Sequence, residues 1–187
     1  KIEFPPSWHA LLRTHCEATG VEYLCTTYLP QDIAVVAADV SRFKIASFEC
    51  DDDDFIAQHF PFGKPIIIST GMADAKRLDQ LRGIRHVGTR YAGVALLHCV
   101  SSYPTPCDQL NLARIRTEEL DGFSDHSGMP LVGAWAVAAG AKIIEAHIRT
   151  NDCPSSNADY GHALRPDEFT LYVRLIRDIE RALGTGE

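Results

Sequence analysis

The sequence predicts an α/β fold of the TIM (β/α)8 type, present here as about six βα units and therefore as an incomplete barrel. Three observations predict it. Short apolar runs alternate with longer stretches of helical periodicity along the chain. Most of these runs are continuous rather than alternately polar and apolar, as in parallel strands that are covered on both faces. Polar residues gather where the runs end, and barrels build their active sites at the carboxyl ends of strands.

The predicted strands are the apolar runs, and each is short enough to be a strand rather than a helix. In chain order they cover residues 21–28, 42–47, 65–70, 94–99, 122–127 and 142–148. The fifth, GFSDHS, is the shortest in apolar content and carries the most polar side chains.

Helical patterns precede, separate and follow these strands. They cover residues 7–19, 30–40, 52–60, 73–84, 107–120, 130–141 and 166–183. The last is the clearest, because Pro166 suits the first position of a helix and Gly184 suits the position just after its end. The acidic run 51–54 is interpreted as the solvated start of the third helix, which the helix dipole favours, rather than as a calcium site.

Chain length leaves the closure of the sheet open. A complete barrel typically needs about 250 residues, whereas this chain has 187, so either the sheet is open or two units are missing. Neither G-x-G-x-x-G nor G-x-x-x-x-G-K-[ST] occurs, which removes the main signals of a nucleotide-binding open sheet. We interpret residues 1–187 as a single partial barrel domain, since a chain of this length with 45% hydrophobic residues supports one core.

Composition and charge indicate which binding partners and which cellular compartment to expect. A net charge of −7 argues against broad binding to nucleic acid or to an anionic membrane. No apolar run approaches the roughly 18 residues of a membrane span, and the N-terminus lacks the regions of a signal peptide, so a soluble cytoplasmic protein is expected. The six cysteines form no C-x-x-C pair and are expected to be reduced and structural.

A local anion site is predicted at the strand ends. Lys44 lies between Phe43 and Ile45 in a predicted strand, so its side chain faces inward, where an unpaired ammonium group is costly. Its partner is either a ligand carboxylate or phosphate, or a carboxylate of the protein core. Hydroxyl groups follow successive strands and, although each alone suits a turn or a helix cap, together they favour a phosphate cradle. These are Ser47, Ser69, Ser101 and Ser124.

Two histidines lie at the ends of neighbouring predicted strands. His126 and His147 are 21 residues apart, and a single such histidine is usually a satisfied core group, but two at adjacent strand ends favour a shared metal. Two imidazoles with oxygen ligands suit manganese, zinc or iron. Asp125 points to the opposite face and is expected to orient structure, while Glu145 and His98 are interpreted as supporting and core groups. His9, His15, His59 and His86 are expected at the surface.

Six spaced motifs resemble the sialic acid synthase family, in the same order and over nearly the whole chain. They are FKIASFE (43–49), KPIIISTGMA (64–73), LHCVSSYPTP (97–106), GFSDHS (122–127), IIEAHI (143–148) and D-x-x-x-A-L-R-P-D-E-F (159–169). The first and third look most like the pseudaminic acid synthase branch. The resemblance implies a barrel enzyme that condenses phosphoenolpyruvate with an N-acetylated hexose to form a nine-carbon 2-keto acid. It also implies a homodimer and a divalent metal, with Mn²⁺ ahead of Zn²⁺, Fe²⁺, Co²⁺ and Mg²⁺.

The resemblance also assigns roles to residues. It implies that Lys44 contacts phosphoenolpyruvate, that His126 and His147 hold the metal, and that Tyr103 and Asp159 bind the amino sugar. The sequence departs from the family where many relatives have asparagine at Ser101, lysine at the position of Ala146 and serine at the position of Ala163.

Measured against the family, the chain begins in the second helix and stops before the C-terminal antifreeze-like domain. Two functions are therefore kept open. One is a metal-dependent synthase that uses phosphoenolpyruvate. The other is a truncated, non-catalytic relative that binds a sugar or regulates a full-length synthase.

Overall fold

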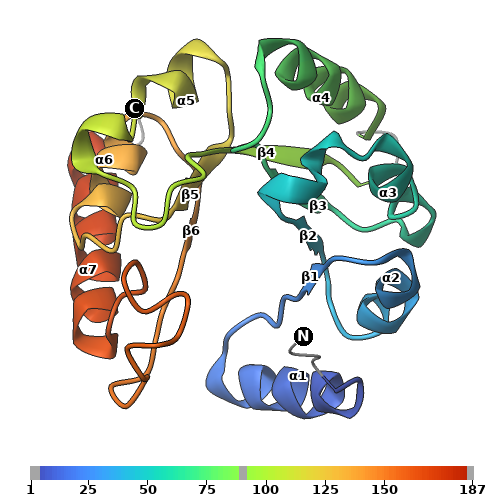
Figure 1. The fold of residues 1–187 in the computed structure, drawn as a ribbon, viewed down its shortest axis with the longest axis horizontal. Coiled ribbons are helices and arrows are strands. Elements are labelled where there is room, and N and C mark those ends of the chain that lie inside the picture. The colour runs from blue at the N-terminus through green and yellow to red at the C-terminus, as the bar shows by residue number, and fades with distance from the viewer. Residues whose placement is uncertain (1–4, 89–91, 185–187) are drawn as a thin grey trace. The chain divides into compact units, whose positions relative to one another are not determined.

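The computed structural model describes residues 5–88 and 92–184, and in them helices alternate with parallel strands (Figure 1). Neighbours in the strand order β1-β2-β3-β4-β5-β6 are neighbours in the chain, which confirms the predicted α/β class built from successive βα units. Contacts divide the chain into two compact units. The first comprises Lys1–Ile68 and Ala73–Ala95, and the second comprises Ser69–Met72 and Leu96–Glu187.

The first unit is built around the parallel pairs β1–β2 and β2–β3, with Lys44 paired in register with Thr26 on one side and Ile67 on the other. Every position of β2 and β3 is buried, as expected of strands covered on both faces. Its elements are α1 (Ser7–Thr19), β1 (Thr26–Thr27), α2 (Pro30–Ala37), β2 (Phe43–Ile45), η1 (Ser47–Asp51), α3 (Asp53–Ala57), η2 (Phe60–Phe62), β3 (Ile66–Ser69) and α4 (Ala75–Gly88).

The second unit carries the strands on which both candidate metal histidines depend. Ser124 is paired in register with Cys99 on β4 and with Glu145 on β6. A cluster of buried side chains that includes Ile115, Phe123 and Val132 packs between β5 and its helices. The elements are β4 (Val94–Cys99), η3 (Cys107–Gln109), α5 (Ala113–Thr117), β5 (Gly122–Asp125), α6 (Val132–Ala138), β6 (Ile143–Ala146) and α7 (Pro166–Leu183).

Two predicted elements differ most from the structure. The run 21–28 forms a strand only at Thr26–Thr27. The stretch 107–120 is not one helix but the short helices η3 and α5, because the backbone of Asn111, between them, is left-handed with φ 45°. Asparagine tolerates this conformation better than most residues, and it interrupts a regular helix.

The acidic run 51–54 does begin a helix. The Asp52 carboxylate accepts a hydrogen bond from the backbone N–H of Phe55 at 2.8 Å, which caps α3. The run is exposed, as predicted, and Asp51 and Asp53 also lie 3.4 and 2.7 Å from the guanidinium of Arg77 on α4. The run therefore also attaches α4 to η1 and α3.

Two histidines expected at the surface are buried, so that prediction is wrong for them. His59 is fully buried, with Nδ1 2.8 Å from the Phe55 carbonyl oxygen and Nε2 2.8 Å from the Thr27 hydroxyl. His9 is also buried, with Nδ1 2.9 Å from the hydroxyl of Tyr23. Both imidazoles thus have polar partners that only the folded chain brings to them.

None of the other three histidines outside the candidate site contradicts its predicted environment. His15 is exposed as expected, and the side chain of His86 lies outside the described residues. His98 is a core group as expected, and its Nε2 donates to the Leu110 carbonyl oxygen at 2.9 Å.

Tyr172 connects helix α7 to β5. Its hydroxyl donates a hydrogen bond to Asp125 Oδ2 at 2.9 Å, while Asp125 Oδ1 accepts from the backbone N–H of Ser127 at 2.8 Å. The ring lies against Gly133 of α6, where a Cβ would come within 2.3 Å of Tyr172 Cζ. Burial, reinforced by the Asp125 carboxylate, raises the pKa of Tyr172 well above its usual range. Asp125 therefore orients structure, as predicted from its face of the strand.

We expect Tyr172→Phe to lower the free energy of unfolding by about 1–3 kcal/mol, because it leaves a buried carboxylate oxygen without its donor. Denaturant unfolding followed by circular dichroism measures this change. Tyr160→Phe is the control, since the guanidinium of Arg149 lies 4.2 Å from the centre of the Tyr160 ring and that contact survives loss of the hydroxyl. Equal stability of the two variants would contradict the anchoring role.

Candidate active site

His126 directly follows β5 and is held in one tautomer. Its side chain is 5% exposed, and Nδ1 lies 3.0 Å from the carbonyl oxygen of Val100. Because a carbonyl oxygen only accepts hydrogen bonds, Nδ1 carries the proton and Nε2 keeps its lone pair. Burial lowers the pKa of His126, opposed by the hydrogen bond to Val100. Burial thus favours the neutral form of the imidazole, which is the form that binds metals.

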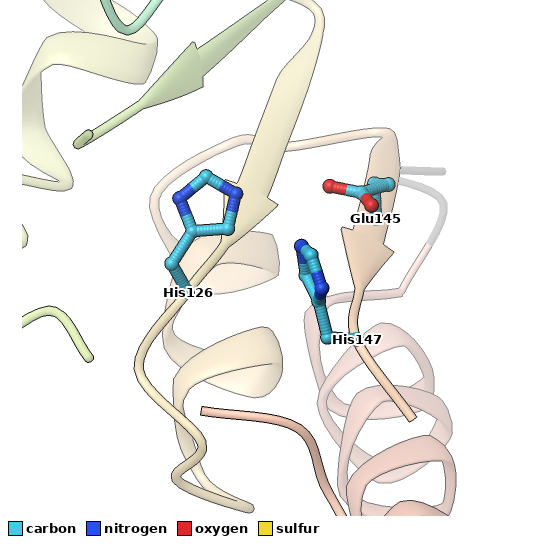
Figure 2. Close-up of side chains that lie close together, drawn as sticks. All are labelled: His126, Glu145 and His147. Atoms are coloured by element: carbon cyan, nitrogen blue, oxygen red, sulfur yellow. The ribbon is translucent and has the colours of Figure 1, made fainter. Parts of the chain in front are cut away.

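The structure brings His147 and Glu145 next to His126 (Figure 2). The ring centroids of His126 and His147 are 5.2 Å apart, and one ligand atom from each of the three residues lies within 4.8 Å of the others. Glu145 is on β6 and His147 follows two residues later, so that both side chains leave the same face of the chain. The predicted pair of histidines is therefore adjacent, and Glu145, interpreted from the sequence only as a supporting group, is a third candidate ligand.

This donor set fits a divalent metal. Two imidazole nitrogens and one carboxylate oxygen are ligands that Mn²⁺, Zn²⁺ and Fe²⁺ accept. The hydrogen bond from His126 to Val100 is of the kind that orients metal-binding histidines in other proteins.

Two of the four predicted phosphate-binding serines contact each other. The hydroxyl oxygens of Ser69 and Ser124 are 3.0 Å apart, and Ser124 donates a hydrogen bond to Glu145 Oε2. Because an ionised carboxylate only accepts, the single hydroxyl proton of Ser124 is used by Glu145, and Ser69 is the donor to Ser124. The two serines therefore position Glu145 in this arrangement.

Ser101 and Tyr103 follow β4 and border the histidines. The Ser101 hydroxyl is buried and has no hydrogen-bond partner among residues 5–88 and 92–184. The Tyr103 ring lies 4.2 Å from the His126 ring, centroid to centroid, and about half of the side chain remains exposed. Ser101 is thus a hydroxyl group that needs a partner, and Tyr103 covers one side of the imidazole while facing solvent.

The loop between β6 and α7 adds Asp159 and His162. Asp159 Oδ2 lies 3.7 Å from His147 Nδ1, and Asp159 Oδ1 lies 3.4 Å from His162 Nε2. His162 is 3% exposed. The sequence analysis predicts Asp159 as a site residue but not His162. The signal that could have indicated His162 is its spacing of three residues from Asp159 in the turn-rich loop CPSSNADYGH.

Lys44 and Ser47 belong to the first unit. Lys44 is 8% exposed, and its ammonium group donates to the Ile45 carbonyl oxygen at 3.1 Å. Burial raises the pKa of Glu49, and the charge of Lys44 opposes this rise. Glu49 is therefore the protein carboxylate that corresponds to the alternative partner predicted for Lys44. Ser47 is buried and begins η1.

Replacing both His126 and His147 by alanine is expected to abolish tight binding of divalent metal, because this removes both imidazoles of the candidate set. Elemental analysis after dialysis against buffered Mn²⁺ or Zn²⁺ measures the bound metal. The exposed His15→Ala variant is the control for a general loss of imidazole. Equal metal content in the double variant and the control would eliminate this site.

The whole chain, residues 1–187, matches the family described as the NeuB family. It is 30% identical to the N,N'-diacetyllegionaminic acid synthase of Campylobacter jejuni, covering 100% of this chain and 58% of that protein. It is 32% identical to the pseudaminic acid synthase of the same species, covering 98% of this chain and 54% of that protein. The chain thus spans somewhat more than half the length of these curated relatives.

Solved structures share the fold. The sialic acid synthetase of Leptospira borgpetersenii superposes with a TM-score of 0.91 at 28% identity, covering 99% of this chain and 66% of that one. A truncated 3-deoxy-D-arabino-heptulosonate 7-phosphate synthase of Thermotoga maritima has a TM-score of 0.77 at 14% identity, over 97% of this chain and 74% of that one, and shows likeness of fold alone. These likenesses confirm the predicted TIM type. Across the described residues, no helix has both the length and the apolar character needed to cross a membrane.

Proposed function

The chain belongs to the NeuB family, and on this premise we propose that it is the barrel part of an enzyme that condenses phosphoenolpyruvate with an N-acetylated hexose. The product would be a nine-carbon 2-keto sugar acid of the sialic, pseudaminic or legionaminic type. The observation that carries the proposal is the adjacency of His126, Glu145 and His147 at the ends of β5 and β6. The relatives include synthases of legionaminic and of pseudaminic acid at similar identity, so the acceptor is proposed as a class, an N-acetylated hexose.

The proposed cofactor is a divalent ion held by His126 and His147, with Glu145 as a further ligand, and Mn²⁺ is the first candidate. When bound, the ion would supply Lewis acidity to the aldehyde oxygen of the sugar. The protein's part is to orient these ligands: Val100 sets the tautomer of His126, and Ser124 holds Glu145.

Other side chains supply binding. We assign the ammonium group of Lys44 to an anionic group of phosphoenolpyruvate, because hydrogen bonds from a charged ammonium group to a phosphate or carboxylate are strong. The buried hydroxyl of Ser101 is a donor for a phosphate oxygen, with Ser47, Ser69 and Ser124 as the remaining hydroxyls of the predicted cradle. Tyr103 and Asp159 are assigned to the amino sugar.

The reaction forms one carbon–carbon bond, the aldehyde oxygen takes a proton to become a hydroxyl group, and at C2 a bond to a water oxygen replaces the bond to the phosphate oxygen. C3 of phosphoenolpyruvate attacks the aldehyde carbon of the sugar, water adds to the electron-deficient C2, and phosphate leaves with the oxygen that joined it to C2. The 2-keto group that remains therefore carries an oxygen atom from solvent. The substrates are two small molecules, and a cytoplasmic homodimer is part of the proposal.

The test is phosphate release by the full-length protein. We expect release from phosphoenolpyruvate only when an N-acetylated hexose and a divalent metal are both present. In ¹⁸O-labelled water, mass spectrometry should find the label at C2 of the product and not in the phosphate. Release without sugar would refute the reaction. Metal binding with no release for any N-acetylated hexose would instead favour the non-catalytic relative.

A further inference from the structure

The loop that follows β6 places a carboxylate and a third imidazole beside His147. His147, Asp159 and His162 each offer one ligand atom within 4.8 Å of the others. The ring centroids of His147 and His162 are 4.6 Å apart. The Nε2 atom of His162 is buried and has no hydrogen-bond partner within the described part of the chain. A buried polar atom of this kind is costly unless something binds it.

The backbone holds this group in place. The N–H groups of His162 and Ala163 both donate to the Asp159 carbonyl oxygen, at 3.1 and 2.9 Å, and this turn puts the two side chains on one side. The N–H of Leu164 donates to the His147 carbonyl oxygen at 2.9 Å, which attaches the loop to the end of β6. On the other side, a Cβ at Gly128 would lie 3.1 Å from His162 Cα, so glycine permits the close approach of the two segments.

We propose that His147, Asp159 and His162 form a second position for a divalent metal, and that it takes Zn²⁺. Two ligands of a tetrahedral zinc ion with bonds of about 2.0–2.1 Å lie about 3.3 Å apart. Asp159 Oδ1 lies 3.4 Å from His162 Nε2, and Asp159 Oδ2 lies 3.7 Å from His147 Nδ1. One ligand atom of each residue lies within 4.8 Å of the others, so modest side-chain rotations would bring the three to one ion. Two imidazoles and a carboxylate bind zinc more strongly than manganese.

The second position is an alternative to the first, not an addition to it. A neutral imidazole carries one lone pair, so His147 serves one ion at a time. The chain therefore holds one ion, shared between the His126, Glu145 and His147 set and the His147, Asp159 and His162 set. An ion in the second position would occupy Asp159, which the proposed function assigns to the sugar. The second position rests on the proposed function in that both sets use His147, but the second set does not include His126.

Zinc binding by four full-length proteins tests the proposal: wild type, His126→Ala, His162→Gln and the variant with both changes. We expect wild type and each single variant to bind one Zn²⁺ per chain, measured by elemental analysis after dialysis in a zinc buffer. The double variant should bind at least about 10-fold more weakly than His126→Ala, since even groups behind metal ligands commonly contribute that much. In the His126→Ala background, Asp159→Asn should lower the affinity for Zn²⁺ as His162→Gln does. Each of these two changes should also abolish the visible spectrum of bound Co²⁺.

The outcomes separate this inference from the proposed function. Loss of all zinc in His126→Ala would overturn the second position. So would equal zinc affinity in His126→Ala and the double variant, provided that circular dichroism shows both to be folded. Equal zinc affinity in wild type and His126→Ala, with loss in the double variant, would support the second position while removing His126 from the proposed function. His15→Gln is the matched control for an exposed imidazole.

Discussion

Gly122→Ala is expected to destabilise the second unit by about 3 kcal/mol or more, and to lower its melting temperature by about 10 °C. Gly122 is the first residue of β5 and is paired with Ile143 of β6 and Leu97 of β4. A Cβ there would lie 2.0 Å from the carbonyl oxygen of Ile143 and 2.8 Å from Leu97 Cδ2. A backbone oxygen inside a sheet cannot rotate away, so β5 and β6 would have to separate.

The same change should weaken metal binding. Glu145 lies on β6 and His126 follows β5, so separation of these strands moves the candidate ligands apart. Gly83→Ala is the matched control, because Gly83 lies inside α4 and a Cβ there would meet nothing within 4 Å. That variant should gain up to about 1 kcal/mol from helix propensity. A melting temperature for Gly122→Ala equal to that of wild type would show that the strands accommodate the methyl group.

Local signals predicted the elements that the structure confirms most closely. The helix Pro166–Leu183 agrees with its predicted bounds because its signals lie in the sequence itself: a proline at its start, Glu168 accepting from the Arg165 N–H at 2.8 Å, and Gly184 at its end. The strand Val94–Cys99 agrees for a similar reason, since its run of apolar residues has a clear beginning and end.

What sequence reasoning missed depends on partners far apart in the chain. His59 is buried because Thr27, 32 residues earlier, supplies its second hydrogen bond, and no pattern near His59 reports this. The pairing of Ser124 with Ser69 likewise joins residues 55 positions apart. Polar residues at strand ends predicted that these groups would gather, but not which hydroxyl would contact which neighbour.

In the candidate site, the two-residue period of a strand predicts that His126 and His147 lie close together, and it also places Glu145 beside them. His126 and His147 were selected because they follow neighbouring parallel strands. Glu145 shares the face of His147, so the same argument applies to it. A carboxylate in a strand can equally be the partner of a buried hydroxyl group, and Glu145 does accept a hydrogen bond from Ser124. His162 depends on the turn at Asp159, whose geometry the composition of the loop does not specify.

Lys44 gives the largest expected effect on activity. In the full-length protein, Lys44→Ala and Lys44→Met should each lower kcat/KM for phosphoenolpyruvate by about 100-fold to 1000-fold, because a positioned charge on a reacting anion commonly contributes several kcal/mol to transition-state stabilisation. Lys44→Met keeps the aliphatic stem of this side chain, which is 8% exposed, so the buried volume changes little. Unfolding measurements should find both variants folded.

Glu49→Gln decides between the two partners considered for Lys44. Burial raises the pKa of Glu49 and the charge of Lys44 opposes this, so removal of the charge should raise the pKa of Glu49 further. If the ammonium group serves phosphoenolpyruvate, Glu49→Gln keeps most of the activity, while the Lys44 variants lose theirs with little loss of stability. If Lys44 serves Glu49 alone, all three variants lose stability and Lys44→Met retains its activity per folded molecule. Full activity of folded Lys44→Met would therefore remove Lys44 from the proposed reaction.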